Sequence, residues 1–98
     1  MNAKEKKLAA VESEIAAERA ASLGRTEKRL KTTLEAIRRF DAGELKGKPR
    51  EQLLSDASEA CLGYVVQREA LGLPTADVRK EYGVSDEVWN LMGAFTCR

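Results

Sequence analysis

One apolar stripe dominates the first part of this chain and limits what it can fold into. At about 100° per residue its members fall within an arc of roughly 140°, which is typical of an amphipathic helix with one buried face. As one helix, the span from residue 8 to residue 40 is about 50 Å long, whereas a compact domain of this size is only about 30 to 35 Å across. Part of the stripe must therefore pack elsewhere, most simply against a second copy of the chain. The stripe consists of Leu8, Val11, Ile15, Leu23, Leu30, Leu34, Ile37 and Phe40.

The first helix is expected to run without a break from about Ala3 to Asp41. Gly24 costs about 1 kcal/mol in a helix interior relative to alanine. It projects opposite the stripe, however, and the apolar residues before and after it lie on the same side of the helix. The alternative ends one helix at Gly24 and starts another with Thr26 as its N-cap. We prefer the continuous helix.

Glycine and proline divide the rest of the chain into three further helices. Gly43, Gly47 and Pro49 mark a loop near the middle. The second helix, from Pro49 or Arg50 to about Leu71, is expected to be central and the most enclosed. It presents one broad apolar face made of Leu53, Leu54, Ala57, Ala60, Cys61, Tyr64, Val65 and Leu71.

Two short helices are expected to follow. The first ends before Gly83, and the second runs from Asp86 to Met92, with Ser85 as its N-cap and Gly93 closing it. The segment resembles a helix-turn-helix in its spacing. Its second helix begins with two acidic residues and contains no lysine or arginine, so phosphates would repel the end that should approach DNA. We interpret this tail as structural, with Tyr82, Val84 and Trp89 facing inward.

Composition gives strong negative indications about chemistry. The chain has no histidine, which removes the commonest general base and the commonest transition-metal ligand. Cys61 and Cys97 are the only cysteines, lie far apart and form no metal-binding pair. We expect free thiols, with Cys61 in the core, and no catalytic residue, metal or cofactor. The sequence lacks a long apolar segment or a signal-peptide core, so we expect a cytoplasmic protein without a membrane association.

Charge is unevenly distributed along the chain. Residues 25–50 hold nine basic groups against four acidic ones, whereas residues 51–98 hold four basic groups against eight acidic ones. A basic helix face can bind nucleic acid or another anion, but no aromatic side chain is interleaved here to stack on bases. We favour a solvated face that pairs with the acidic second half. The candidate anion-binding residues are Arg25, Lys28, Arg29, Arg38 and Arg39.

Together these patterns predict an all-α fold: a long N-terminal helix packed on a central helix with two short C-terminal helices, in a helical-bundle-like homodimer. Residues 1–98 are expected to form one helical domain, with residues 1–24 projecting for dimerisation and residues 25–98 making the core. The expected dimer interface is Leu8, Val11 and Ile15.

The function that this sequence favours is that of a small non-enzymatic interaction or scaffold protein. Its expected partners are a second copy of itself and, beyond that, an unidentified protein. The alternative is a nucleic-acid-associated protein that uses the basic face of residues 25–50 or the helix-turn-helix-like tail, residues 76–92. We do not expect nucleic-acid binding, because the last helix begins with acidic residues and no aromatic side chain is interleaved with the basic groups of residues 25–50.

Overall fold

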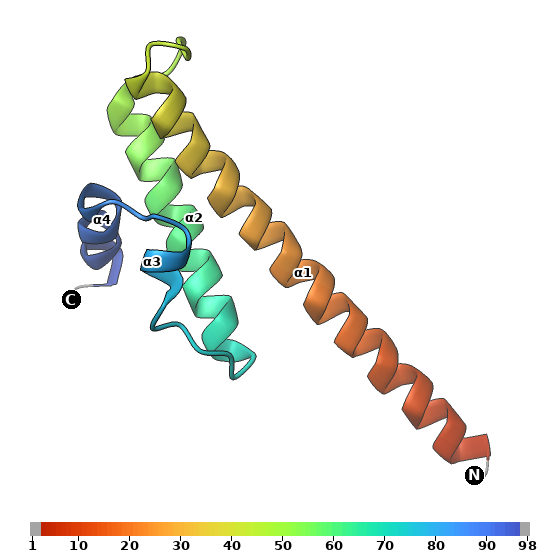
Figure 1. The fold of residues 1–98 in the computed structure, drawn as a ribbon. Helices are drawn as coiled ribbons and strands as arrows, with labels where there is room; N and C mark the ends of the chain where they lie inside the picture. Colours follow the sequence, from red (N-terminus) through yellow and green to blue (C-terminus); the bar gives the residue numbers. More distant parts are fainter. Residues whose placement is uncertain (1–2, 97–98) are drawn as a thin grey trace.

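The computed structural model describes residues 3–96, with side chains from residue 7 to residue 93, and within that part of the chain it contains helices and no strand (Figure 1). The first two helices form an antiparallel hairpin, the fourth packs on the second, and Tyr82 at the end of the third reaches both helices of the hairpin. The predicted all-α class and order of helices are confirmed. The helices are α1 (Ala3–Asp41), α2 (Arg50–Ala70), α3 (Val78–Glu81) and α4 (Asp86–Thr96).

The long helix α1 is continuous through Gly24, as predicted. Gly24 is exposed, and a Cβ atom added there would meet nothing within 4 Å. It therefore marks no close helix contact, and its cost is only that of its low helix propensity. The alternative break with Thr26 as an N-cap is wrong. Thr26 lies inside the helix, where its hydroxyl donates to the carbonyl oxygen of Leu23 at 2.8 Å.

The second helix α2 is the centre of the fold, because it packs against both α1 and α4. Cys61 and Ala57 are fully buried in its apolar face, and Tyr64 is almost so. Leu30 of α1, also fully buried, packs into the same cluster. The apolar pattern did not indicate one further buried residue of α2, Ser58, whose hydroxyl donates to the carbonyl oxygen of Ser55 at 2.9 Å.

The C-terminal helices close over α2 with their apolar residues inward. Val78, Val84 and Val88 are buried, whereas Tyr82 and Trp89 are only partly covered. Ser85 caps α4 as predicted, since its Oγ accepts the backbone N–H of Val88 at 3.3 Å.

The predicted end of the last helix at Gly93 is wrong, because α4 continues to Thr96. A glycine that ends a helix usually adopts a positive φ. In this structure Gly43, Gly47, Gly72 and Gly83 do so, and Gly93 does not. Gly93 is therefore an interior residue of α4.

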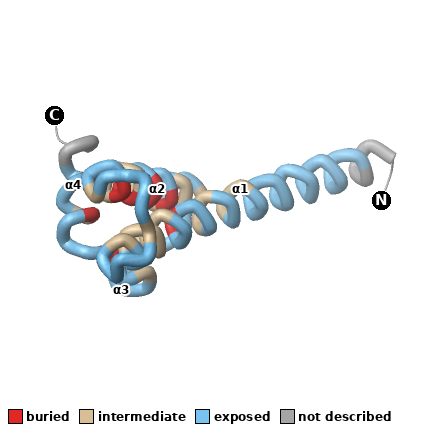
Figure 2. The backbone as a smooth tube through the Cα atoms, turned by 90° about the horizontal axis from the view of Figure 1, so that it is seen from above, coloured by how far each residue is buried: buried red, intermediate tan, exposed pale blue. Residues whose placement is uncertain are grey.

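Roughly the first half of α1 projects beyond the body of the protein (Figure 2). Residues 7–21 are all exposed, and the molecule measures 61 × 31 × 22 Å. Contact with α2 begins at Ser22, whose Oγ accepts the Gln67 side-chain amide at 2.6 Å, and continues with Thr26, whose Oγ1 lies 2.7 Å from Gln67 Oε1. The exposed part of α1 thus ends at Ala21, slightly before the predicted boundary at residue 24. We call residues 3–21 the projecting segment.

Leu30 is expected to be a main source of stability. Truncation of this fully buried side chain in Leu30→Ala should lower the free energy of unfolding by about 2 to 5 kcal/mol, because it leaves a cavity between α1 and α2. The matched control is Val66→Ala on α2, where the side chain is 53% exposed and the change should stay within about 0.5 kcal/mol. Urea denaturation followed by circular dichroism measures both. Equal effects would show that Leu30 does not anchor the hairpin.

Candidate interaction surface

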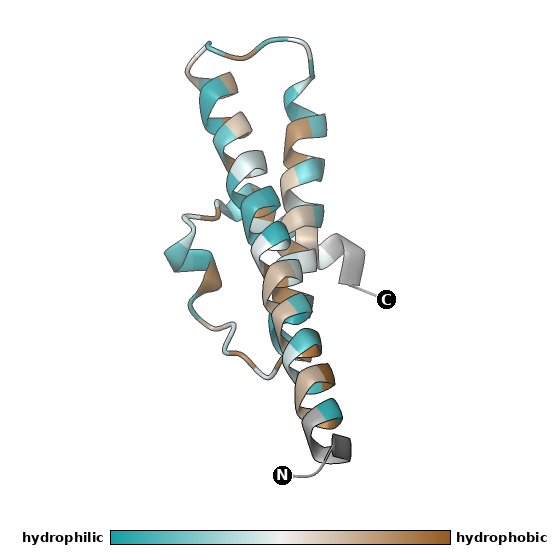
Figure 3. Cartoon of the chain, turned by 90° about the vertical axis from the view of Figure 1, so that its right-hand side faces the viewer, coloured by the Kyte–Doolittle hydropathy of each residue, from teal (hydrophilic) through white to brown (hydrophobic). Residues whose placement is uncertain are grey.

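The projecting segment carries the three apolar side chains predicted to form an interface. Leu8 is 57% exposed, Val11 50% and Ile15 47%. They lie on one side of α1, and Figure 3 shows apolar positions recurring along this half of the helix. We call these three residues the apolar strip. Single exposed apolar residues are common, but a row of them on an otherwise polar, unsupported helix indicates a contact surface.

Local sequence makes the projecting segment helical without making it strongly stable. Seven of its residues are alanine, the best helix former. At its base, the guanidinium of Arg25 donates to Glu18 at 3.0 Å, but both side chains are well exposed. Exposed ion pairs contribute little, and helices without tertiary packing are only marginally stable in water. A partner that covers the apolar strip would therefore also stabilise the helix.

Of the five candidate anion-binding residues, four lie within an arc of about 100° on α1, and only Arg38 lies outside it. At 100° per residue, Arg29 and Arg38 point to opposite sides of α1. Their charges also have partners, since Arg29 lies 3.7 Å from Glu59 and Arg38 Nε donates to Glu35 at 2.9 Å. Similar ion pairs join Arg25 to Glu18 at 3.0 Å and Arg39 to Glu44 at 3.9 Å. Lys28 is exposed on α1.

The basic stretch pairs in part with the acidic second half of the chain, as the charge pattern indicates. Arg50, at the start of α2, donates to both Asp41 oxygens at 2.8 and 3.2 Å and to both Glu87 oxygens at 2.7 and 3.0 Å. It therefore ties the end of α1 to the beginning of α4. This guanidinium holds the pKa of each carboxyl below its ordinary value, through hydrogen bonds above all. We call this group the Arg50 clamp.

A second polar group lies where α1, α2 and the end of α3 meet. The hydroxyl of Tyr82 donates to Glu27 Oε2 at 2.6 Å and lies 2.9 Å from the hydroxyl of Tyr64. The two rings meet edge to face at 5.3 Å. Arg68 donates to the Tyr64 hydroxyl at 3.2 Å, and Lys31 lies 3.3 Å from Glu27, one helical turn before it. We call Glu27, Tyr64 and Tyr82 the tyrosine cluster.

The electrostatics of the tyrosine cluster suit structure better than proton transfer. The hydrogen bond from Tyr82, followed by that from Lys31, lowers the pKa of Glu27 below its ordinary value of 4.5. Burial and the neighbouring carboxylate raise the pKa of Tyr82. Both values move away from neutrality, whereas a general acid or base works best with a pKa near the working pH. At pH 7 the cluster therefore holds an ionised Glu27 carboxylate and a neutral Tyr82 phenol.

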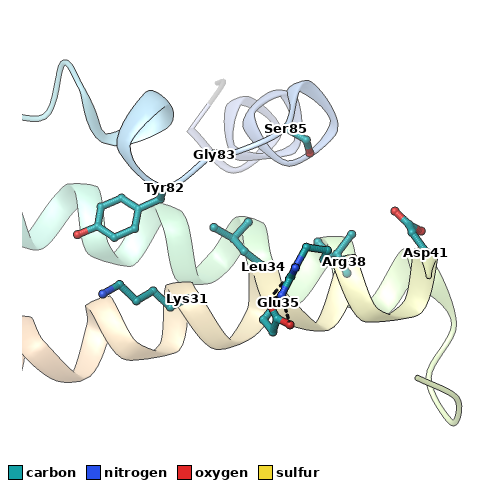
Figure 4. Close-up of a pocket in the computed structure, with 9 residues that line it drawn as sticks. Lys31, Leu34, Glu35, Arg38, Asp41, Tyr82, Gly83 and Ser85 are labelled. Atoms are coloured by element: carbon teal, nitrogen blue, oxygen red, sulfur yellow. Dashed lines mark hydrogen bonds and ion pairs between the residues drawn. The ribbon is translucent and has the colours of Figure 1, made fainter. Parts of the chain in front are cut away.

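A groove of about 500 Å³ separates α1 from the turn between α3 and α4 (Figure 4). Its charged side chains already have partners: Arg38 is paired with Glu35, Asp41 with Arg50, and Lys31 with Glu27. A ligand would have to displace these pairs, so we assign no binding role to the groove. It is lined by Lys31, Leu34, Glu35, Ile37, Arg38, Asp41, Tyr82, Gly83 and Ser85.

The predicted core position of Cys61 is confirmed. Its thiol is fully buried, and burial raises its pKa to about 11, so almost no thiolate forms near neutral pH. Cys97 lies outside the described residues. Within the described part of the chain, no group of histidine, cysteine, aspartate or glutamate side chains is arranged to hold a metal ion, and no helix is long and apolar enough to cross a membrane.

Comparison with known proteins identifies a family. The entire chain, residues 1–98, matches DUF6665, described as a family of unknown function. The chain belongs to the DUF6665 family. No curated protein and no solved structure gives a significant match. The family assignment adds no activity, so the role of this DUF6665 member has to be argued from its own surface.

Sequence reasoning missed the residues that organise polar contacts between helices. Gln67 and Arg50 each have two partners on other elements. No periodicity marks a polar side chain whose partner is distant in sequence, so only the three-dimensional arrangement identifies them. For Tyr64 and Tyr82 the apolar spacing located the rings, but it did not indicate that the hydroxyls meet at Glu27.

Tyr82→Phe tests the tyrosine cluster. At pH 7 the loss of the hydroxyl should lower the free energy of unfolding by about 1 kcal/mol, because a hydrogen bond to a carboxylate is removed. Since the folded-state pKa of Glu27 lies below 4.5, this stabilisation is fully present above about pH 4.5 and is lost as the pH falls through the lower folded-state value. Urea denaturation between pH 3 and pH 7 measures the difference.

The matched control for this experiment is Glu35→Gln, which removes an exposed pair with Arg38. It should leave stability unchanged, because exposed ion pairs contribute little. A difference between Tyr82→Phe and the unmodified protein that stays constant across the pH range would contradict the assigned role of Glu27.

The ion-paired charges of α1, with no aromatic side chain interleaved among them, lead us to expect weak nucleic-acid binding. In about 0.15 M salt, where the screening length is roughly 8 Å, fluorescence polarisation with single- and double-stranded oligonucleotides should show no binding at micromolar protein. Tight binding that falls steeply with added salt would instead show that the basic groups act together on phosphates.

Proposed function

We propose that this protein is a non-enzymatic interaction module that self-associates through the apolar strip. The observation that carries the proposal is the exposure of Leu8, Val11 and Ile15 on a helix that extends beyond the body of the protein. Amphipathic helices of this kind commonly gain their stability by laying an apolar face on another helix. A second copy of the chain offers the same face, and a two-fold pairing satisfies both strips at once.

The size of the apolar strip sets the expected affinity. Each side chain is already about half covered by its own helix, so full burial contributes about 1 kcal/mol for each of six side chains in a dimer. Association costs at least about 4 kcal/mol in lost translational and rotational freedom. The difference, about 2 kcal/mol, supports only a weak dimer, with a dissociation constant on the order of tens of millimolar.

Two further features support this proposal. The tyrosine cluster and the groove beside it offer paired charges and pKa values shifted away from neutrality, which favours a binding role over a catalytic one. The buried free thiol of Cys61 suits a reducing compartment, and we propose the cytoplasm as the site of action.

The test is the triple variant Leu8→Ser, Val11→Ser and Ile15→Ser. Sedimentation equilibrium from about 0.1 to 5 mM should show an apparent mass of the unmodified protein that rises above the monomer mass with concentration, as this weak affinity implies. The variant should remain monomeric because its apolar strip is gone. Its body should stay folded, since none of the three residues contacts α2 or α4.

The matched control places the same number of serines on the other side of the projecting segment, in Ala10→Ser, Ala17→Ser and Ala21→Ser. These alanines are exposed and point away from the apolar strip. Because serine is a poorer helix former than alanine, the control should dimerise somewhat more weakly than the unmodified protein but more tightly than the strip variant. A monomer mass for the unmodified protein at every concentration would refute self-association.

A further inference from the structure

The position of α2 on α1 restricts how a second copy can lie on the apolar strip. At 100° per residue, the strip lies on the same side of α1 as Ser22 and Thr26, the two residues that bond to Gln67 of α2. Beyond Ala21 this side of α1 is occupied by α2, and before it the same side is open. A helix laid on the strip therefore runs along the line on which α2 continues.

We infer that the two copies pair antiparallel through residues 3–21, an inference that rests on the proposed self-association. A parallel partner would continue past residue 21 into the space that α2 occupies, and each α2 would stand between the two long helices. Figure 1 shows α1 as one straight helix, without the bend that would separate the pair at that point. A parallel in-register pairing is therefore blocked by the body of the protein.

An antiparallel partner meets no such obstacle, because the projecting segment is as long as the space available for it. Laid on its own copy, it overlaps over about 28 Å. Residue 3 of the partner then lies level with residue 20, at the end of α2, whose Gln67 contacts Ser22. The two-fold axis passes between Val11 and Glu12. The apolar strip and the α1–α2 interface then form one continuous line of helix packing.

Side chains fit this arrangement. With the axis between Val11 and Glu12, Leu8 faces the partner's Ile15, and the two Val11 side chains meet near the axis. Lys7 and Glu14 lie on one edge of the apolar strip, and antiparallel helices bring like edges together. Lys7 of each copy therefore lies beside the partner's Glu14, which gives two symmetric attractive pairs. On the other edge the two Glu12 side chains meet near the axis, a like-charge pair in this arrangement. The bodies of the two copies lie at opposite ends of the dimer.

Spin-label distances test the orientation. Labels are attached at Ala10→Cys or Ala21→Cys in a Cys97→Ser background, in which the remaining Cys61 is buried. Both alanines point away from the apolar strip, so the labels do not touch it. In the antiparallel dimer, position 21 is displaced from its counterpart by about 28 Å along the axis and position 10 by about 5 Å. The label distance at position 21 should exceed that at position 10 by about 10 to 15 Å.

Solution scattering provides a second measurement on the unmodified protein. One chain is 61 Å long, and an antiparallel overlap of about 28 Å gives a dimer about 95 Å long. A side-by-side parallel pair would stay close to the length of one chain. Equal label distances at positions 10 and 21, with a short dimer, would overturn the antiparallel inference and leave the dimer intact. A monomer mass in sedimentation at every concentration would overturn the proposed self-association, and the antiparallel inference with it.

Discussion

The difference in length between α1 and α2 determines the rest of this structure. α1 has 39 residues and α2 has 21, and the two form one antiparallel hairpin. A helix rises about 1.5 Å per residue, so α2 covers only about half of α1. The covered half gains a core built around Leu30 and Cys61, and the other half keeps an apolar strip with no cover among the described residues. The body, the projecting segment and the proposed mode of association all result from this mismatch.

Polar contacts fix the hairpin at both ends of its apolar contact. At the loop end, the Arg50 clamp joins α1, α2 and α4. At the open end, Gln67 bonds to Ser22 and lies beside the hydroxyl of Thr26. The tyrosine cluster lies nearby and also includes Tyr82 at the end of α3. Apolar packing favours contact but tolerates sliding, whereas hydrogen bonds with defined partners set the register of one helix against the other. Glu87, in the acidic first turn of α4, is one of the two carboxylates that pair with Arg50, so this turn has a structural role.

The sequence was sufficient to predict the helices and the apolar residues between them. The recurrence of Leu23, Leu30 and Leu34 identified the buried side of α1, and the cap at Ser85 identified the start of α4. The end of α4 was predicted too early, because a glycine can be either a helix terminus or an interior residue, and the backbone angle that decides between them depends on tertiary packing. Polar partners such as Arg50 and Glu87 are far apart in sequence, and no local pattern connects them. The exposure of the apolar strip was predicted from a length argument, which needs no knowledge of individual contacts.

Gly24 stands close to the point where cover by α2 begins, and this position divides α1 into two parts of unequal stability. Backbone amides after Gly24 are protected from hydrogen exchange by the core and exchange only when the body unfolds. Those of the projecting segment exchange through local unfolding whose free-energy cost is close to zero. Association and helix ordering are then one coupled process, as in segments that fold on binding. Its affinity depends on the helix propensity of residues that never touch the partner. Substitution of a solvent-facing alanine of residues 9–21 by a poorer helix former therefore weakens pairing, although that residue lies outside the interface. Substitution of Gly24 by a better helix former strengthens pairing.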